Sequence, residues 1–315
     1  MPLYFLMTAF GIIYCFLPKS IVQCGMNNIF AAWRNGTYCS PADLSLSILD
    51  LGVVHSDATY DVLAVRQGRA LQLDAHIDRL TESCRGWRLP MPYTPEQLKT
   101  VVTELVHRSG LDSAFVWLAV TRGIPRSGNP RDLASCATQV MAYAKPYYGF
   151  NATNTARLCM STVPRTPDAS INQRFKNWAW PDLTQAQWQA IDRGYDSAVL
   201  LDHNGHLTEG PGFNVAVVID DVIHIPQHNV LGGITMATVA KLCEANSIAY
   251  KYSNIDQHRL EAATDMFITS TAGDIITVTD FESHVFTPSS QQLALKKLIE
   301  QAWTQDAYST LLRTI

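Results

Sequence analysis

The sequence lacks the cysteine arrangements that are typical of disulfide-stabilised domains and zinc sites. Its seven cysteines are odd in number, widely scattered and never spaced as C-x-x-C. Small secreted domains and structural zinc sites repeat cysteines at short, regular spacings. We therefore expect no metal site, a reducing compartment and a cytoplasmic location, and we interpret the glycosylation sequons at Asn35 and Asn151 as accidental.

The sequence also lacks an excess of basic residues and any run of them. Lys and Arg number 24 against 28 Asp and Glu, which gives a net charge of −4. Proteins that neutralise a phosphate backbone usually carry a basic stripe, so the composition gives no support for a nucleic-acid partner. With 47% hydrophobic and 17% charged residues, the chain can bury a sizeable core, and its 315 residues favour two domains over one.

One uncharged apolar run, PLYFLMTAFGIIYCFLP at residues 2–18, precedes an otherwise ordinary sequence. Its length fits a signal-peptide core better than a membrane span, but it has no basic segment before it and no small-residue cleavage site after it. Three interpretations stay open: a weak signal or anchor, an additional buried helix, or translation upstream of a true start at Met26, which we prefer. Apart from this extension, residues 1–25, we expect no membrane contact.

The first half alternates short apolar runs with two longer periodic segments. Period-two and apolar runs predict strands, whereas apolar residues three and four apart predict helices. The predicted strands cover 46–54, 61–68, 70–73, 114–123 and 138–146, and the predicted helices cover 74–87 and 94–110. Asp74 is placed to cap the first helix, and Thr94, Pro95 and Gly110 are placed to start and end the second.

The second half repeats this mixture after a plausible linker at residues 146–154. Its predicted strands cover 156–163, 197–202, 214–220, 222–226 and 266–271, and its predicted helices cover 182–194, 235–247 and 289–305. Helices inserted among hairpins predict an α+β fold rather than strict βαβ alternation. We expect a small N-terminal domain over 26–145 and a larger C-terminal domain over 155–315.

Lys176 lies in an aromatic segment, INQRFKNWAWPD at residues 171–182. Its stem could pass along an apolar wall while the ammonium reaches water. Alternatively, the amine could be held in a pocket where its pKa falls and it becomes a nucleophile. Taken alone, the segment favours packing, and the rest of the chain has to decide.

Glu209 and two glycine-containing turns add chemistry to the second half. Glu209 follows a hairpin turn at Asn204-Gly205 and precedes a strongly apolar strand, where a carboxylate needs a cationic or hydrogen-bonding partner. Gly232-Gly233 precede a predicted helix that opens with Ile234 and Thr235, and such a helix start can bind an anion. The turn STAGD at 270–274 offers hydroxyls to the same kind of ligand. A nucleophilic lysine, a buried acid and phosphate-binding turns together suggest pyridoxal phosphate (PLP).

In order and spacing, these segments resemble the fold-type IV PLP-dependent aminotransferases, which are also called class IV. The resemblance covers essentially residues 30–300, and its motifs are HIDRL (76–80), FKNWAW (175–180), LTEGPGFN (207–214) with VLGGIT (230–235), and STAGD (270–274). Within the family, HSDATYDV (55–62) and KNWAWPDL (176–183) are most similar to (R)-selective amine transaminases. The resemblance implies the two-domain fold of the D-amino-acid aminotransferases, with the cofactor in the interdomain cleft, and a homodimer.

The resemblance also implies roles for individual residues. Lys176 would form the Schiff base and carry a proton, Glu209 would pair with the pyridine nitrogen, and the phosphate would be bound by Arg79, Ile234, Thr235 and Thr271. The substrate pockets would be lined by His55, Tyr60, Val62, Phe115, Trp117 and Trp180. Two residues depart from the family pattern. Asp274 stands where a second glycine is common, and Trp117 places a large ring beside Phe115.

A Gly/Pro-rich segment, TRGIPRSGNPRD at residues 121–132, contains three arginines. A mobile arginine could pair with a carboxylate through its planar fork and move aside for an uncharged group. Arg126 is the first candidate and Arg131 the second. The resulting hypothesis is a ping-pong transaminase that moves the amino group of a primary, (R)-configured amine to a keto acid such as pyruvate. The alternatives are a branched-chain or D-amino-acid aminotransferase, an aminodeoxychorismate-lyase-like enzyme and, from another class, a cofactor-free binding protein.

Overall fold

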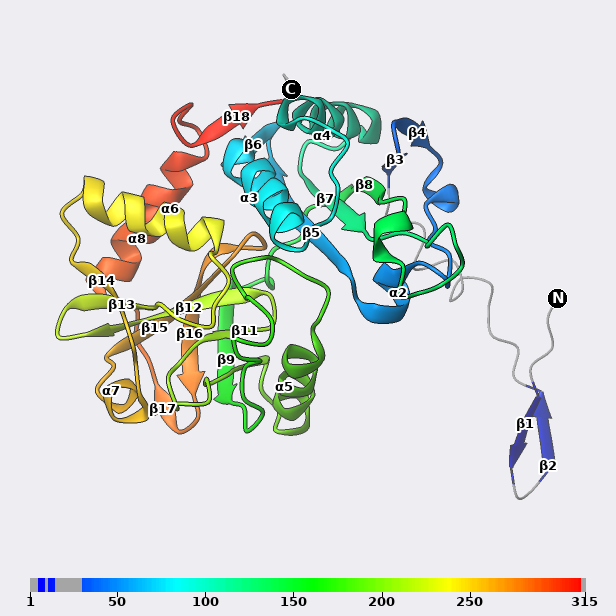
Figure 1. Ribbon diagram of the computed structural model, residues 1–315. Helices are drawn as coiled ribbons and strands as arrows, with labels where there is room; N and C mark the ends of the chain where they lie inside the picture. The colour runs from blue at the N-terminus through cyan, green and yellow to red at the C-terminus, as the bar shows by residue number, and fades with distance from the viewer. Residues whose placement is uncertain (1–4, 9–10, 15–29, 313–315) are drawn as a thin grey trace.

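The computed structural model describes residues 5–8, 11–14 and 30–312 of the chain (Figure 1). Strands β1 (Phe5–Thr8) and β2 (Gly11–Tyr14) form an antiparallel pair, so this part of the apolar run is not the buried helix of one interpretation. The other two interpretations, a signal and a start at Met26, concern residues that lie largely outside the described part. Among the described helices, none combines the length and the apolar character that crossing a membrane requires.

The first half, together with one strand that follows α8 (Ser290–Ala302), builds a seven-stranded antiparallel sheet in the order β18-β6-β5-β7-β8-β3-β4. Its strands are β3 (Ala31–Arg34), β4 (Thr37–Cys39), β5 (Ala58–Arg66), β6 (Arg69–Leu71), β7 (Ala114–Thr121), β8 (Gln139–Pro146) and β18 (Ser309–Leu311). Helices α3 (Leu73–Gly86) and α4 (Pro95–Ser109) pack on one face, as Figure 1 shows, and the short α2 (Leu51–His55) precedes β5.

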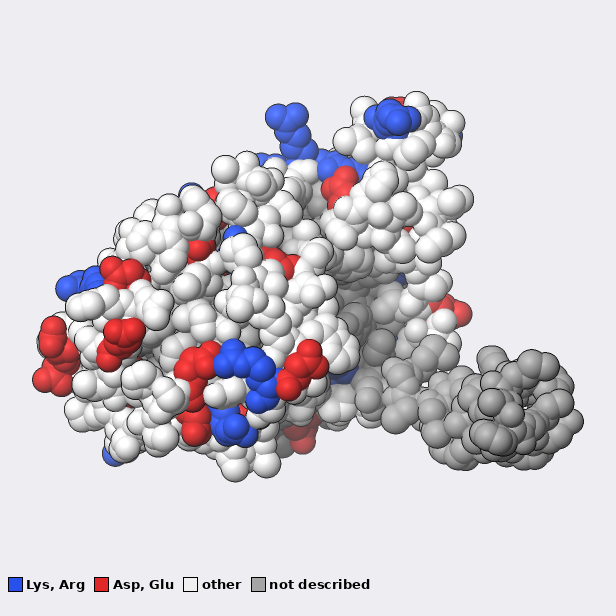
Figure 2. All heavy atoms as spheres, turned by 90° about the horizontal axis from the view of Figure 1, so that it is seen from below, with Lys and Arg blue, Asp and Glu red and all other residues white. Residues whose placement is uncertain are grey.

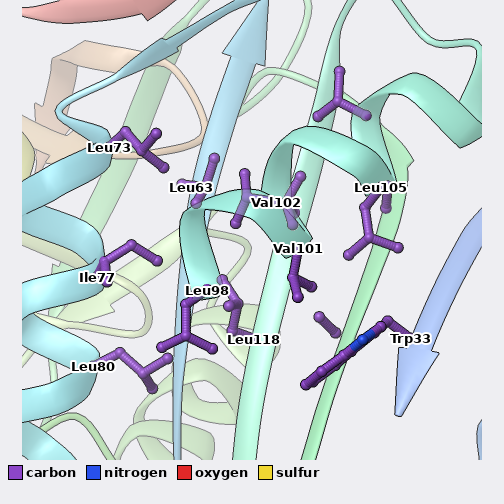
Figure 3. Close-up of a cluster of buried hydrophobic side chains, with 14 of the residues drawn as sticks. Trp33, Leu63, Leu73, Ile77, Leu80, Leu98, Val101, Val102, Leu105 and Leu118 are labelled. Atoms are coloured by element: carbon purple, nitrogen blue, oxygen red, sulfur yellow. The ribbon is translucent and has the colours of Figure 1, made fainter. Parts of the chain in front are cut away.

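The core of this sheet lies under α3 and α4, as Figure 3 shows. Because side chains alternate along a strand, Leu63 of β5 and Leu118 of β7 face the helices, which contribute Ile77, Leu80 and Leu98. All five side chains are at most 1% exposed, and burial of each stabilises the fold by roughly 1.5–3 kcal/mol. This core fixes β5 and α3 against each other, and these two elements carry Tyr60 and Arg79.

The helix ends separate a correct prediction from a wrong one. In α4, Thr94 and Gln97 form a reciprocal capping box, and Gly110 ends the helix with φ +69°, as expected. The predicted cap of α3 by Asp74 is wrong, because the helix already begins at Leu73 after Gln72, which adopts φ +52° and makes no side-chain cap.

The predicted strand at 46–54 is also wrong, because its second part forms α2. Asp50 is 1% exposed, and its carboxylate accepts hydrogen bonds from Gly52 N–H (2.8 Å), Gly123 N–H (3.2 Å) and the Thr121 hydroxyl (2.7 Å). A buried carboxylate needs such partners, and a helical turn after Asp50 provides one of them. The apolar residues Ile48, Leu49, Val53 and Val54 therefore lie exposed instead of pairing in a sheet.

The second half builds a nine-stranded mixed sheet in the order β10-β9-β16-β15-β12-β13-β14, with β11 paired to β12 and β17 to β16. Its strands are β9 (Thr155–Met160), β10 (Ser197–Val199), β11 (Glu209–Gly210), β12 (Phe213–Ile219), β13 (Val222–Pro226), β14 (Tyr250–Ser253), β15 (Asp265–Ser270), β16 (Asp274–Phe281) and β17 (His284–Val285). Its helices are α5 (Pro181–Asp192), α6 (Ile234–Ala245), α7 (Gln257–Glu261) and α8 (Ser290–Ala302). The predicted α+β class is confirmed.

The two sheets are joined by residues 147–154, which lie between β8 and β9, as Figure 1 shows. The division of the chain at this segment stays a prediction, and it needs one amendment. After α8 the chain returns to the first sheet, where β18 pairs with β6, so residues 309–311 do not share the sheet of the predicted C-terminal domain.

On the face that Figure 2 shows, acidic and basic side chains lie in mixed groups separated by uncharged surface.

Candidate active site

One cavity lies between the two sheets and gathers side chains from both halves of the chain. Eight of the residues predicted from the sequence line it: Tyr60, Arg79, Lys176, Trp180, Glu209, Ile234, Thr235 and Thr271. Tyr60 comes from β5 and Arg79 from α3, whereas the others follow β9 in the chain. The fold therefore brings Tyr60 and Thr271 to one cavity although more than two hundred positions separate them in the sequence.

Lys176 is half-buried, and its Nζ atom lies 4.5 Å from the centroid of the Tyr60 ring. Removal of the amine from water and, to a smaller extent, the neighbouring Arg79 guanidinium lower its pKa to about 8, against the opposing charges of Asp61 and Glu209. A lysine with this pKa is partly deprotonated near neutral pH, which an exposed lysine is not. The environment of Lys176 thus favours the nucleophile over the packing interpretation.

Glu209 is 5% exposed and accepts hydrogen bonds at both oxygens. Its Oε1 accepts from Nε (3.0 Å) and Nη2 (2.9 Å) of Arg165, and its Oε2 accepts from Leu231 N–H (3.0 Å) and Asn214 Nδ2 (3.3 Å). Burial raises the pKa of the Glu209 carboxyl, and the Arg165 guanidinium and the Leu231 N–H oppose that rise. The sequence predicted that Glu209 needs a cationic or hydrogen-bonding partner, and the structure provides both: Arg165 is the cation, and Leu231 and Asn214 donate hydrogen bonds.

Arg165 itself was missed by the sequence analysis. It is 5% exposed and also donates to Asp182 Oδ2 (2.6 Å) and Gln173 Oε1 (2.6 Å), so its charge is shared between two carboxylates. An isolated arginine between prolines has no periodicity that marks it as buried. The only available signal was indirect, namely the demand of a buried Glu209 for a cation.

Arg79 is held by a second carboxylate that the sequence analysis missed. Nε and Nη2 of Arg79 donate to the two oxygens of Asp61 (2.8 and 2.9 Å), and Nη1 donates to the Gly232 carbonyl (3.1 Å). His76 Nδ1 lies 2.7 Å from Asp61 Oδ1. Burial would raise the pKa of Asp61, but Arg79 and His76 together hold it well below its usual range. A carboxylate inside an apolar strand was a usable signal for such a cluster.

The start of α6 fits a phosphate group. Its N-cap residue, Gly233, makes no side-chain cap, which leaves the backbone N–H groups of Ile234 and Thr235 for an anion at the positive end of the helix dipole. A Cβ atom at Gly233 would lie 1.7 Å from Asn214 Oδ1, so glycine is required there. Thr269 lines the same cavity, and its buried Oγ1 has no partner among the described residues. These features fit a phosphorylated cofactor that supplies the missing partners.

A family model with the description "Amino-transferase class IV" matches residues 58–281 of the chain. This span contains every residue that lines the cavity. The chain belongs to the class IV aminotransferases. The family uses PLP, so the predicted cofactor, fold type and enzyme class are confirmed.

Relatives of known name support this membership of the class IV aminotransferases. The chain is 29% identical over 272 residues to a putative branched-chain-amino-acid aminotransferase of Methanocaldococcus jannaschii, which covers 85% of this chain and 94% of that protein. It is 27% identical over 284 residues to the D-alanine aminotransferase of Bacillus licheniformis, with 89% and 98% covered. The branched-chain aminotransferase of Thermoproteus uzoniensis, solved with norvaline, has the same fold with a TM-score of 0.85 at 19% identity, and covers 90% of this chain and 100% of that one.

Five residues predicted to line the substrate pockets lie outside this cavity. Val62 and Trp117 lie behind Tyr60 on the same sheet face, and Phe115 is 2% exposed against Tyr147 and Tyr148. His55 is exposed at a separate small cavity that shares Asn177 with the main one, and Arg126 is exposed on its loop. The contributions of these five residues to substrate binding stay predictions.

Proposed function

We propose that this class IV aminotransferase moves the amino group of a primary, (R)-configured amine to a keto acid such as pyruvate. The observation that supports the proposal best is the aromatic wall beside Lys176. Tyr60 stacks on Trp117 at 5.3 Å and 11°, and Trp178 and Trp180 pack in the same apolar cluster. Such a wall suits a donor with an aryl or other large apolar group, and it excludes misfits by size.

The charges in the cavity point in the same direction. Among the described residues, the cations that line it are Arg79, Arg165 and Lys176. Arg165 is paired with Glu209 and Asp182, and Arg79 and Lys176 are assigned to the cofactor. No lining cation is left for a permanent carboxylate on the donor, and a simple amine needs none. The carboxylate of the acceptor would be bound by Arg126 or by Arg131, which both lie in the Gly/Pro-rich segment at residues 121–132.

The proposed roles of the chain's residues follow from these contacts. When bound, PLP supplies an electron sink beside the carbon that carries the amino group. Lys176 would anchor it covalently and carry a proton to and from that carbon, because its pKa of about 8 lets the amine accept and release protons near neutral pH. Glu209 would keep the ring nitrogen protonated, and Arg79, Ile234, Thr235 and Thr271 would bind the phosphate.

A branched-chain or D-amino-acid aminotransferase is the second candidate. It is favoured by the relatives, whose names are branched-chain-amino-acid aminotransferase and D-alanine aminotransferase. In this alternative both substrates carry a carboxylate, so Arg126 or Arg131 would be needed in both halves of the reaction.

A donor panel separates the two candidates. The purified enzyme is supplied with PLP and pyruvate and tested with both enantiomers of 1-phenylethylamine, and in parallel with L-leucine, L-valine and D-alanine with 2-oxoglutarate. We expect turnover of (R)-1-phenylethylamine and little of the (S)-enantiomer. Activity confined to the amino acids would support the second candidate, and pyruvate released without an acceptor would indicate a lyase.

We also propose that the enzyme is a homodimer that buries an apolar surface near α2. This surface consists of the exposed side chains Ile48, Leu49, Val53, Val54, Ile124 and Leu133. The two segments that carry them are adjacent, because Leu51 N–H donates to the Gly123 carbonyl at 3.0 Å. Exposed apolar side chains on neighbouring segments are typical of an association surface.

Light scattering tests the dimer. The wild-type enzyme is expected to have twice the chain mass of 35.0 kDa, and Leu49→Glu, a change at a side chain that is 65% exposed, is expected to shift it toward the monomer. A monomeric wild type would refute the dimer and leave the transaminase proposal intact.

A cytoplasmic location is also part of the proposal, and cell fractionation tests it. It is favoured by the free thiols of Cys39, Cys84, Cys136, Cys159 and Cys243.

A further inference from the structure

Both backbone polar groups of Lys176 are bound by side chains from the first half of the chain. The Lys176 carbonyl accepts hydrogen bonds from Thr59 Oγ1 at 2.6 Å and from Trp87 Nε1 at 3.3 Å. The Lys176 N–H donates to Ser83 Oγ at 3.2 Å. Thr59 and Ser83 are 0% exposed, so neither hydroxyl can exchange its protein partner for water.

These three side chains come from β5, α3 and the residue that ends α3, whereas Lys176 lies between β9 and α5. The same neighbourhood continues on both sides of the lysine. Trp178 N–H donates to the Ala58 carbonyl at 3.4 Å. Phe175 packs so closely on α3 that a Cβ atom at Gly86 would lie 2.4 Å from its ring.

Strand β5 therefore contacts both the peptide group and the side-chain amine of Lys176, through two consecutive residues. Thr59 binds the Lys176 carbonyl, and the next residue, Tyr60, places its ring 4.5 Å from the Lys176 Nζ. Segment 161–180 contains neither a helix nor a strand, so it has no backbone ladder of its own that could hold the lysine. The direction of the side chain depends on the small number of hydrogen bonds to β5 and α3.

We propose that Thr59, Ser83 and Trp87 are positioning residues that fix the Lys176 peptide and thereby set the direction in which its amine meets the cofactor. The inference rests on the proposed role of Lys176 as the covalent anchor. It adds that β5 and α3 of the first half of the chain, not the second sheet, determine where the anchor points. A buried carbonyl that loses its strongest donor would let the peptide turn, and the amine would turn with it.

A set of four variants tests the clamp on the cofactor-free protein. Thr59→Val removes the hydroxyl with little change of shape, Thr59→Ser retains the hydroxyl, and Ser83→Ala removes the acceptor of the Lys176 N–H. Thr100→Val is the matched control, because Thr100 is exposed on α4 and bonds only its own helix at Glu96 O. Circular dichroism and thermal unfolding report whether each variant folds.

The main measurement is the rate at which an amine-reactive reagent modifies Lys176, followed by peptide mass spectrometry from pH 6 to 10. An amine that turns away from its buried place regains water and titrates at higher pH. Thr59→Val and Ser83→Ala should therefore label about threefold or more slowly at pH 7 than the wild type, whereas Thr59→Ser and Thr100→Val should match it. Equal titration of all five proteins would overturn the clamp.

Protection by PLP keeps the clamp distinct from the proposed function. If Lys176 is the anchor, saturating PLP blocks its labelling in the wild type. A wild type that is labelled equally with and without PLP would refute the anchor role, whereas a protected wild type with an unaltered Thr59→Val variant would refute only the clamp. If Thr59→Val fails to fold, Trp87→Phe removes the second donor to the same carbonyl, and its labelling rate at pH 7 is expected to fall in the same direction.

Discussion

Tyr60 and Lys176 meet across the two sheets: the lysine Nζ lies 4.5 Å from the centroid of the tyrosine ring. The ring comes from β5 of the first sheet, and the lysine follows β9 of the second. The attraction between a cation and an aromatic ring stabilises a protonated lysine. Here burial and the neighbouring Arg79 guanidinium both lower the pKa of Lys176 and so outweigh that attraction. The contact therefore holds an amine that can lose its proton, and the active site exists only when both sheets are in place.

Lys176→Ala is expected to abolish transamination and leave the fold intact. The amine is the proposed covalent anchor and proton carrier, so without it turnover should fall by several orders of magnitude, below detection. Lys176→Arg should fail equally, because a guanidinium stays protonated. Steady-state rates with saturating PLP, with circular dichroism as the folding control, check both variants. Turnover near the wild-type rate in either variant would end this assignment.

Glu209→Gln is expected to lower kcat on the order of 10- to 100-fold, the range that corresponds to the loss of one charged hydrogen bond. A glutamine has a single acceptor oxygen, so it can accept from Arg165 or from Leu231 N–H but not from both, and circular dichroism checks that the fold persists. A neutral amide also cannot favour a protonated ring nitrogen. Glu300→Gln, at an exposed carboxylate paired with Arg66, is the control. Full activity in Glu209→Gln would show that another residue serves the ring nitrogen.

Arg79→Ala is expected to weaken PLP binding by about 1.5–3 kcal/mol, the contribution of one charge-assisted contact. Asp61→Asn should weaken it less, because Arg79 keeps its charge and loses only the two-pronged contact that orients it. Equilibrium dialysis of PLP against each protein gives the two dissociation constants. If Asp61→Asn bound PLP more weakly than Arg79→Ala, Asp61 would have a role beyond orienting Arg79.

The parts of this fold that were predictable from sequence are those in which neighbouring residues determine the structure. The capping signals of α4 lie within its own segment, and the HIDRL, FKNWAW and VLGGIT motifs place Arg79, Lys176 and Thr235 by short local patterns. Periodicity alone also gave most of the strands. These features need no information about which distant segment packs where.

The failures share the opposite property. Arg165 is buried because Glu209 and Asp182 need its charge, and both lie many residues away. Asp50 begins a helix instead of interrupting a strand, because Thr121 and Gly123 meet its carboxylate. β18 joins the first sheet although it follows the second in sequence. Each depends on a long-range pairing, which propensity and periodicity do not contain.

Asp274→Asn is expected to change how stability depends on pH. Burial raises the pKa of Asp274 from 3.8 to about 6, although Trp303 Nε1 and Arg66 donate to its carboxylate. Between about pH 4 and 6 the folded protein thus holds a proton that the unfolded chain has lost, so this carboxyl contributes stability that is lost as the pH rises. The effect is on the order of 3 kcal/mol. Asparagine tolerates the φ of +56° at this position.

Thermal unfolding of the PLP-loaded proteins between pH 4 and 7 measures this effect as a difference. The Tm of the wild type relative to that of Asp274→Asn should fall as the pH rises from 4 to 6 and then level off. Asp306→Asn makes the same change at a side chain that is 94% exposed, and its difference from the wild type should stay flat across this range. A flat difference for Asp274→Asn as well would mean that Asp274 titrates like an exposed carboxyl.

Arg126→Ala is expected to raise the KM for pyruvate much more than the KM for the amine donor. Arg126 is exposed on the loop that follows β7, outside the cavity that holds Lys176, so it must move to meet a substrate carboxylate. A simple amine has no carboxylate and so makes no ion pair with Arg126, whereas pyruvate loses a charged partner worth roughly 1.5–3 kcal/mol, or about 10- to 100-fold in KM.

Arg131→Ala, on the same loop, is the matched variant and should leave both KM values near those of the wild type. If Arg131→Ala instead shows the pyruvate defect, the two arginines exchange roles. Equal effects of Arg126→Ala on both substrates would indicate general damage to the loop, and a donor KM that rises only with amino-acid donors would favour the branched-chain or D-amino-acid alternative.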